Sequence, residues 1–327
     1  MWYLFGIVAV DDRNAMLSER TVCFKDIAII ARKTEKWDLN GLDKTEIFHR
    51  LLSHQKTLEI IMQHQSVIPI KFGTVVNCLE EIQVILQRNL DLFRRILKEM
   101  KGKIEFSLSI SWDEKAQLKK ICQEDKDISE IKTEVINKGG LDALAKFGKA
   151  LENKLRERKT QITAGILKEL NHLIIARIDH KIPEEKIIAN ISFLIPQDRE
   201  EKFLECIGHV DEKFGGEIDF KCISPLPPHS FCTVHIQKLS SQKLSEAFEF
   251  FKIREETTLE ELKNKNRELI RCYHPDTKQE NEEDDLLRVH ETFNLLKNFF
   301  IAKDDKPFVN LDKERCFFTT ISSKEGA

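Results

Sequence analysis

The spacing of apolar residues predicts strands in the first part of the chain. Runs rich in apolar and β-branched residues occupy 3–10, 21–31 and 67–76, and the segment 103–112 alternates apolar and polar side chains with a period of two. Such alternation is typical of a strand with one buried face and one solvated face. These segments therefore predict an open antiparallel sheet with a hydrophobic and a polar side.

Helical stripes separate these strands. One stripe lies between the strands 21–31 and 67–76, and its members are Ile47, Leu51, Leu58, Ile61 and Gln65. Another runs through 79–100 in steps of three and four residues, with charged residues between its members. The order β-β-α-β-α-β, with helices on one face of the sheet, predicts a ferredoxin-like N-terminal domain over 1–112.

Residues 113–240 predict a charged helical hairpin followed by a second ferredoxin-like α+β domain. The segment 113–160 is crowded with charges, and Gly139-Gly140 is its one obvious break. Strand-like runs then occupy 187–195, 217–223 and 231–237, and a helical run occupies 198–210. The fold class expected for the chain is therefore α+β.

Residues 244–303 predict a small all-α helical hairpin. A short helix at 248–253 and a longer one at 258–272 precede a stripe that is spaced by 3 and 4 residues, formed by Leu286, Val289, Phe293, Leu296 and Phe300. We expect the tail 304–327 to be frayed beyond Phe317-Phe318.

The composition indicates a soluble globular chain. Of its 327 residues, 41% are hydrophobic and 33% are charged, and no apolar run reaches the ~18 to 20 residues of a membrane span. The apolar start lacks the basic residues and cleavage site of a signal peptide. A formal charge of -3 argues against nucleic acid and anionic lipid as partners. The 8 cysteines, with no CxxC pair, favour reduced thiols and a cytoplasmic location.

No motif predicts an active site, a metal or a cofactor. His229, Cys232 and His235 are metal-ligand types at short spacing, but no CxxC and no second histidine pair completes a tetrahedral set, so a structural role is favoured. The GxSxG, GxxxxGK[ST] and GxGxxG patterns do not occur. We therefore expect that the protein is not an enzyme.

Two stretches resemble the signatures of a known family. The run Ile68-Pro69-Ile70-Lys71-Phe72-Gly73-Thr74-Val75-Val76 is similar to one signature of the GvpL/GvpF gas vesicle proteins, and Ser224-Pro225-Leu226-Pro227-Pro228-His229-Ser230-Phe231 is similar to the other. The segments 3–10, 103–114 and 190–205 fit the same family, so the resemblance covers 1–238. In the second signature, Leu226 and His229 stand where the family usually has Trp and Tyr.

The signature residues have a structural and a partner-binding interpretation, and the sequence leaves both open. Pro69 has no backbone N–H to donate, so it must lie at a sheet edge or a strand start, and Gly73 permits a tight turn. Pro227-Pro228 imposes an extended approach to the next strand, although an exposed pair could also dock a partner segment. The candidate residues are Pro69, Phe72, Gly73, Thr74, Pro225, Pro227, Pro228 and Phe231.

A third stretch resembles a different family. Residues 258–276 are similar to helix II and the following turn of a DnaJ-type J-domain, with His274, Pro275 and Asp276 as the turn triplet. In J-domains this turn and the basic face of helix II engage a DnaK-type ATPase chaperone, for which Lys263, Arg267 and Arg271 are the basic residues present here. The segment 244–303 has 10 basic and 14 acidic residues, which is a poor match for an acidic partner.

These resemblances imply a non-enzymatic accessory protein of gas vesicle assembly, cytoplasmic and associated with the vesicle. Gas vesicle shells are built from a small, very apolar protein, so a soluble accessory protein would shield and deliver it. The implied partners are vesicle shell and accessory proteins, and a DnaK-type chaperone recruited by the J-like helices. The alternative is a general J-domain co-chaperone without a gas vesicle role.

Overall fold

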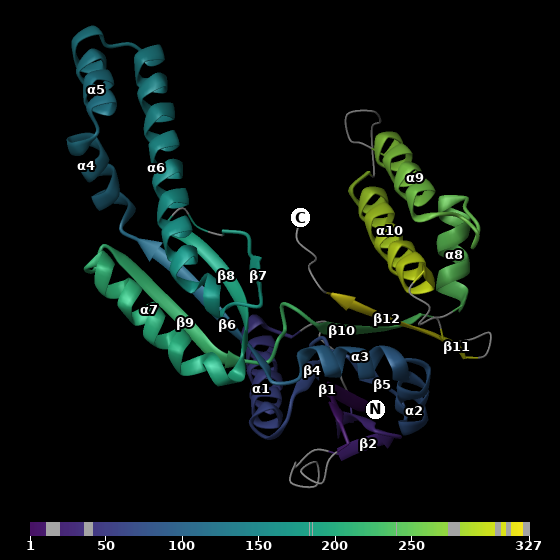
Figure 1. Ribbon diagram of the computed structural model, residues 1–327. Helices are drawn as coiled ribbons and strands as arrows, with labels where there is room; N and C mark the ends of the chain where they lie inside the picture. Colours follow the sequence, from purple (N-terminus) through teal and green to yellow (C-terminus); the bar gives the residue numbers. More distant parts are fainter. Residues whose placement is uncertain are drawn as a thin grey trace. The chain divides into compact units, whose positions relative to one another are not determined.

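The computed structural model describes residues 1–10, 20–35, 42–182, 184, 186–239, 241–273, 282–304, 309–311 and 315–322. The chain forms two compact units (Figure 1). Unit 1 comprises Met1–Lys101 and Cys232–Ser323, and unit 2 comprises Gly102–Phe231. The chain therefore leaves unit 1 before the predicted strand at 103–112 and returns to it after the second signature. This division differs from the boundaries expected at 112 and 240.

The main sheet of unit 1 is antiparallel, with the strand order β2-β3-β1-β4 and with β5 also paired to β1. Its strands are β1 (Trp2–Ala9), β2 (Arg20–Phe24), β3 (Ile27–Lys33), β4 (Val67–Pro69) and β5 (Val75–Val76). The segment 21–31, expected as one strand, is a hairpin. The chain reverses at Lys25, which adopts a φ of 53°, and a continuous apolar and β-branched run does not reveal such a turn.

Helices cover both faces of this sheet, so the expectation that they lie on one face is wrong. α1 (Lys44–His64) packs on the face that carries Tyr3 and Phe5. α2 (Leu79–Arg88) and α3 (Leu90–Met100) pack on the opposite face. Consecutive residues of β1 are consequently buried from Tyr3 to Val8, as expected for a strand with a helix layer on each side.

The helices of unit 1 also differ in detail from the stripes in the sequence. The run 79–100 is divided at Asn89, which ends α2 and begins α3, and its Nδ2 donates to the carbonyl of Ile85 at 2.8 Å. In α1, Leu58 is buried as expected, but Leu51 is 43% exposed and His54 is 4% exposed. Apolar spacing alone therefore placed Leu51 on the wrong face.

Unit 1 also contains the C-terminal segments. β10 (Thr233–Leu239), β11 (Val309–Leu311) and β12 (Arg315–Ser322) form an antiparallel sheet of order β10-β12-β11, and Ile70 forms a parallel bridge with Val234. The expectation of a frayed tail is therefore wrong as far as Ser322. The backbone of β10 offers a ladder of donors and acceptors that β12 fills along its whole length.

Three helices lie between β10 and β11 in the sequence. They are α8 (Ser241–Phe251), α9 (Leu259–Cys272) and α10 (Glu282–Asp304). Their shared apolar core includes Phe251, Leu262, Val289, Leu296 and Phe300, all of which are buried. Thr258 and Glu261 form a capping box that begins α9, because each side chain bonds to the other residue's backbone N–H.

Unit 2 has the order β-α-β-β-α-β, in which three helices occupy the first helical position. Its elements are β6 (Lys103–Trp112), α4 (Glu114–Glu124), α5 (Lys126–Lys138), α6 (Leu141–Leu170), β7 (Ala176–Asp179), β8 (Ile187–Pro196), α7 (Glu200–Phe214) and β9 (Ile218–Leu226). Short 3-10 turns occur at Asn171–Leu173 and Gln197–Arg199. The antiparallel sheet has the order β7-β8-β6-β9.

β6 was expected to complete the first sheet, but it is an inner strand of the second one. It pairs with β8 along Lys103–Ser111 and with β9 along Glu105–Trp112. Conversely, β10 was expected in the second domain and lies in unit 1. Period-two alternation shows that a strand has a buried face, but it carries no information about which sheet supplies the neighbouring strands.

Candidate partner-binding site

The first signature forms the edge strand β4, a turn and β5 in unit 1. Pro69 ends β4 opposite Gly6, at the edge position in which a missing N–H is tolerated. Gly73 has a φ of 86° and donates its N–H to the Tyr3 hydroxyl at 3.3 Å. Thr74 is buried, and its hydroxyl donates to the Lys71 carbonyl at 2.6 Å. These contacts hold the turn against β1.

A buried histidine anchors the same turn to α1. The Tyr3 hydroxyl lies 2.7 Å from His54 Nδ1, and the His54 ring stacks on Phe5 at 5.6 Å and meets the edge of Phe72 at 5.7 Å. Burial raises the pKa of Tyr3, so its phenol stays protonated and can donate. The sequence did not single out Tyr3 or His54, because their pairing spans 51 residues.

The second signature is clamped to the sheet of unit 2 by a buried carboxylate. Glu105 in β6 is 3% exposed, and it accepts the Ser230 N–H at 2.8 Å and the Ser230 hydroxyl at 2.7 Å. Ser230 Oγ lies 3.1 Å from Ser192 Oγ in β8, which in turn lies 2.8 Å from His180 Nε2. A chain of hydrogen bonds therefore connects the loop of the second signature to β6, to β8 and to the residue that follows β7.

The remaining residues of the second signature are mostly enclosed. Pro227, Pro228 and Phe231 are buried, whereas Pro225 is exposed. The His229 N–H donates to the Pro227 carbonyl at 2.7 Å, and the Phe231 N–H donates to the Pro228 carbonyl at 3.2 Å. The buried proline pair therefore offers no exposed ledge, and these contacts favour the structural interpretation of the signature.

Acidification is expected to destabilise the protein through His229. Burial lowers the pKa of this imidazole from 6.5 to about 4. Between these values the unfolded chain binds a proton that the folded chain does not, so stability falls as the pH falls below about 6.5. We expect a loss of about 1 kcal/mol at pH 5.5 relative to pH 7. Urea denaturation at both pH values would measure it.

His229→Gln should reduce this pH dependence, and His209→Gln is the matched control because His209 is an exposed histidine of α7. An equal loss of stability at pH 5.5 in wild type and in His229→Gln would contradict the assignment.

The residues singled out on the J-like stretch are only partly described. Lys263, Arg267 and Arg271 are exposed on α9 at i, i+4 and i+8, so they share one face of the helix. His274, Pro275 and Asp276 lie outside the described residues.

No metal centre is found in the part of the chain that the structure describes. No group of three or more His, Cys, Asp or Glu side chains within it is arranged to hold an ion. Cys232 is 1% exposed and belongs to the apolar core of unit 1.

The helices α4, α5 and α6 form a hairpin, here called the arm. Side-chain caps begin α4 and α5, and glycines form the turn between α5 and α6. Asp113 and Asp125 cap α4 and α5 by accepting the N–H groups of Ala116 and Ile128. The Ile128 N–H and Lys154 Nζ, the latter at 3.2 Å, hold the pKa of Asp125 below its usual value. Gly139 and Gly140, with φ values of 62° and 99°, form the turn between α5 and α6, which extend away from the sheet of unit 2 (Figure 1).

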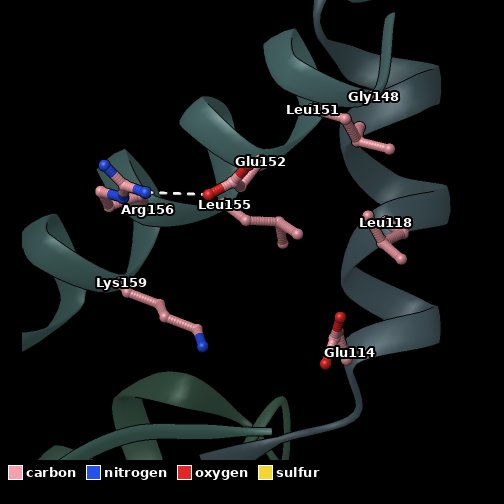
Figure 2. Close-up of a pocket in the computed structure, with 8 residues that line it drawn as sticks. All are labelled: Glu114, Leu118, Gly148, Leu151, Glu152, Leu155, Arg156 and Lys159. Atoms are coloured by element: carbon pink, nitrogen blue, oxygen red, sulfur yellow. Dashed lines mark hydrogen bonds and ion pairs between the residues drawn. The ribbon is translucent and has the colours of Figure 1, made fainter. Parts of the chain in front are cut away.

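A groove lies between α4 and α6. Figure 2 shows Leu118 of α4 facing Leu151 and Leu155 of α6, with Glu114 and Lys159 at the end nearest the sheet. The cavity has a volume of about 400 Å³. Its three leucines are only half-buried, so α4 and α6 leave apolar surface between them.

The groove also has a charged rim. Arg156 donates to Glu152 at 2.9 Å on the exposed side of α6. Lys159 donates to the Ile187 carbonyl at 3.2 Å and lies 5.6 Å from the centre of the Trp112 ring, which ties the base of α6 to the sheet. An apolar strip with charges along its sides is the surface that an amphipathic helix fits.

The far end of the arm is more apolar and more exposed. Ile136 of α5 is 73% exposed, and Leu141 and Leu144 of α6 are 85% and 56% exposed. A second cavity of about 630 Å³ at this tip is lined in part by Ile131, Val135 and Leu141. Within Lys126–Lys138, Ile128 is the buried apolar residue. Large apolar side chains gathered at an exposed tip are typical of protein-binding surfaces.

The sequence indicated this hairpin but not the surface it offers. Leu144, Leu151 and Leu155 follow a helical stripe that could equally have been buried against α5, and their exposure depends on how far apart the helices lie.

In the described residues, no helix is both long enough and apolar enough to traverse a lipid bilayer.

Known proteins resemble this chain in sequence and in fold. Gas vesicle protein F of Dolichospermum flosaquae is 28% identical over 185 residues, which cover 55% of this chain and 76% of that protein. Gas vesicle protein F of Nostoc sp. is 27% identical over 188 residues, covering 56% of this chain and 77% of that protein. The crystal structure of the gas vesicle protein GvpF from Anabaena sp. PCC7120 matches with a TM-score of 0.61 and 23% identity, covering 69% of this chain and 96% of that one.

This structural match shows a shared mixed α+β fold. The model of the family "Gas vesicle synthesis protein GvpL/GvpF" matches residues 1–233 of this chain. This range ends at the start of β10 and does not include α8, α9 and α10. The resemblance inferred from the two signatures is thereby confirmed over that range. This chain belongs to the GvpL/GvpF family of gas vesicle synthesis proteins.

Proposed function

We propose that this chain is a non-enzymatic accessory protein of gas vesicle assembly, which binds apolar shell protein through the arm and delivers it in soluble form. The observation that carries the proposal is the exposure of Ile136, Leu141 and Leu144 at the tip of the arm, continued by the leucine groove. An apolar shell subunit aggregates unless its surface is covered before assembly. A projecting apolar helix pair with charged flanks supplies such cover.

The arm is suited to transient binding. Its groove is open along one side, and the paired charges on its rim leave the leucines accessible. Covering a leucine side chain contributes about 1.5 to 3 kcal/mol, so a few such contacts hold a client without preventing its release. The proposed partners are therefore vesicle shell and accessory proteins, and the proposed location is at the growing vesicle in the cytoplasm.

Replacing the tip leucines should weaken client binding without unfolding the arm. We expect Leu141→Ser with Leu144→Ser to reduce affinity for the shell protein about a hundredfold, because two apolar contacts are lost. The measurement is light scattering after purified shell protein is diluted from denaturant, with and without an equimolar amount of this chain. Wild type should suppress the scattering, and the double variant should not.

Leu204→Ser and Ile223→Ser provide matched controls, because these residues are 43% and 49% exposed in the same unit but lie outside the arm. If wild type neither suppresses scattering nor co-purifies with any vesicle component, the assembly role is wrong. If the double variant acts like wild type while the controls do too, the client site is elsewhere.

A second proposed function concerns α8, α9 and α10. They share a core, and α9 presents Lys263, Arg267 and Arg271 on one exposed face, which supports recruitment of a DnaK-type chaperone by a J-domain-like segment. The excess of acidic residues in 244–303, 14 against 10 basic, weakens steering toward an acidic chaperone surface.

Stimulation of a DnaK-type ATPase by the full chain is the expected result, and Asp276→Asn should abolish it. Stimulation without any effect on the shell protein would favour a general co-chaperone. Equal ATPase rates with wild type, with Asp276→Asn and without added chain would exclude recruitment through this segment.

A further inference from the structure

The sheet of unit 2 has an open edge at β9. In the order β7-β8-β6-β9 this strand is the outer one, and in the described part of the chain it pairs with β6 alone (Figure 1). The side of β9 that faces away from β6 therefore presents backbone N–H and C=O groups to which no described strand is paired. With 9 residues, β9 is long enough to receive another strand.

Two opposite charges lie on β9 without an ion-pair partner among the described residues. Asp219 and Lys221 are both exposed. Their neighbours in β6 are uncharged, because Asp219 lies opposite Ser111 and Lys221 lies opposite Ser109. Since side chains alternate along a strand, a spacing of two puts both charges on the same face of the sheet. This face of β9 therefore offers one acidic and one basic group to a neighbouring strand.

The other edge of the sheet, β7, differs in both respects. β7 is a strand of 4 residues, and its two charged side chains, Arg177 and Asp179, form an ion pair with each other at 3.5 Å. The same spacing of opposite charges is thus satisfied within β7, whereas the charges of β9 remain available to a partner.

The charges of β9 are complementary to those of a second copy. When two identical antiparallel strands are related by a twofold axis, one residue lies opposite its own copy. If that residue is Phe220, Asp219 of each copy lies opposite Lys221 of the other. Centring the pair on Asp219 or on Lys221 would instead oppose two like charges, which destabilises antiparallel strands. Centring it on Cys222 would leave both charges opposite uncharged residues.

The other contacts of the register centred on Phe220 are aromatic or apolar. Phe220 would meet its own copy on the face that α7 covers, where its ring lies 6.3 Å from that of Phe214. Ile218 of each copy would lie opposite Cys222 of the other. Aromatic pairs and opposite-charge pairs both stabilise neighbouring antiparallel strands. We propose that two copies of this chain associate through antiparallel pairing of β9, centred on Phe220.

Sedimentation velocity of the full chain, at concentrations from about 1 to about 100 μM, would test this association. The paired segment is short, so the interface belongs to the small, weak class, and we expect a dimer with a dissociation constant of about 10 μM. Asp219→Lys would oppose lysines across the interface, and Lys221→Asp would oppose aspartates. Each should weaken the dimer by about tenfold or more, because attraction becomes repulsion at two symmetry-related positions.

Two combinations of these changes should restore the dimer. An equimolar mixture of the Asp219→Lys chain and the Lys221→Asp chain again places a lysine opposite an aspartate at both positions. The double variant, Asp219→Lys with Lys221→Asp, does the same within one chain. Asp179→Lys is the matched control, because it makes the same change at an exposed position of the other edge strand, and it should leave the dimer unchanged.

Wild type that stays monomeric up to about 100 μM would overturn the proposal. Single variants that dimerise as tightly as wild type, or a control that weakens the dimer as much as they do, would also overturn it. So would loss of the dimer in both single variants without recovery in their mixture, whereas recovery shows that both variants fold. The assay contains no shell protein, so its outcome is independent of the client-binding test.

Discussion

Gly6→Ala is expected to lower the free energy of unfolding by about 3 kcal/mol, because the space beside Gly6 in β1 cannot hold an added Cβ atom without displacing its neighbours. A Cβ atom on Gly6 would lie 2.5 Å from Val67 Cγ2 and 3.0 Å from both the Ile68 carbonyl oxygen and Leu58 Cδ2. One of these neighbours is backbone, and β4 and α1 cannot both withdraw without breaking contacts in the core. Urea denaturation followed by circular dichroism would measure the loss.

Gly208→Ala is the control, and it is expected to raise the stability of the protein. Gly208 lies in α7, and a Cβ there would meet nothing within 4 Å. Alanine should therefore stabilise the protein by roughly 0.5 to 1 kcal/mol, because glycine is the more costly residue in a helix interior. If Gly6→Ala were as stable as wild type while Gly208→Ala behaved as expected, the close packing of β1, β4 and α1 would not be a constraint.

Glu105→Leu is expected to cost about 3 kcal/mol, since it removes the acceptor of two hydrogen bonds from Ser230. Each donor left without its partner in a half-buried loop loses about 1 to 3 kcal/mol. Glu105→Gln keeps one acceptor oxygen at the same place, so it should cost about 1 kcal/mol. Both values follow from urea denaturation of the full chain.

A double-mutant cycle with Ser230→Ala would assign the effect to this pair. Because the two residues share their hydrogen bonds, the combined loss should be smaller than the sum of the single losses by about 1 kcal/mol or more. Additive losses would mean that Glu105 and Ser230 act separately. In that case the second signature would not be held by β6.

The Gly6 and Glu105 variants together test whether the two family signatures stabilise the fold. Gly6 faces Pro69 of the first signature, and Glu105 binds Ser230 of the second. If both variants lose stability as expected, the signatures serve the fold, and the search for the client site belongs on the arm.

Much of the local structure could be predicted from the sequence. The turn at Gly139-Gly140 and the helix that begins after Thr258 each depend on residues whose conformational preferences act over a few positions. By contrast, the run 67–76 was expected as one strand, but it is divided into β4 and β5 by the turn at Gly73. The family followed from two short signatures, because each requires several uncommon residues in a fixed order. The charged helical hairpin expected within 113–160 corresponds to α4, α5 and α6, although the glycine break did not reveal the division between α4 and α5 or the length of α6.

The candidate site was less accessible to such reasoning. The sequence analysis did not single out Ile136, Leu141 or Leu144, and only their exposure in the folded chain supports the proposal that they bind a partner. Exposure and proximity are properties of packing, which neither periodicity nor composition records.

The family and the mixed helix and strand content could be predicted from the sequence, because they depend on short motifs and on residue preferences over short spans. The tertiary structure decided that β6 joins the second sheet, that β12 pairs with β10, and that Glu105 meets Ser230. Strand pairing and buried hydrogen bonds join segments that are distant in the sequence. Which segments pair depends on how much apolar surface the whole chain buries in that arrangement. Glu105 and Ser230 are 125 positions apart in the sequence, so no local pattern predicts their contact.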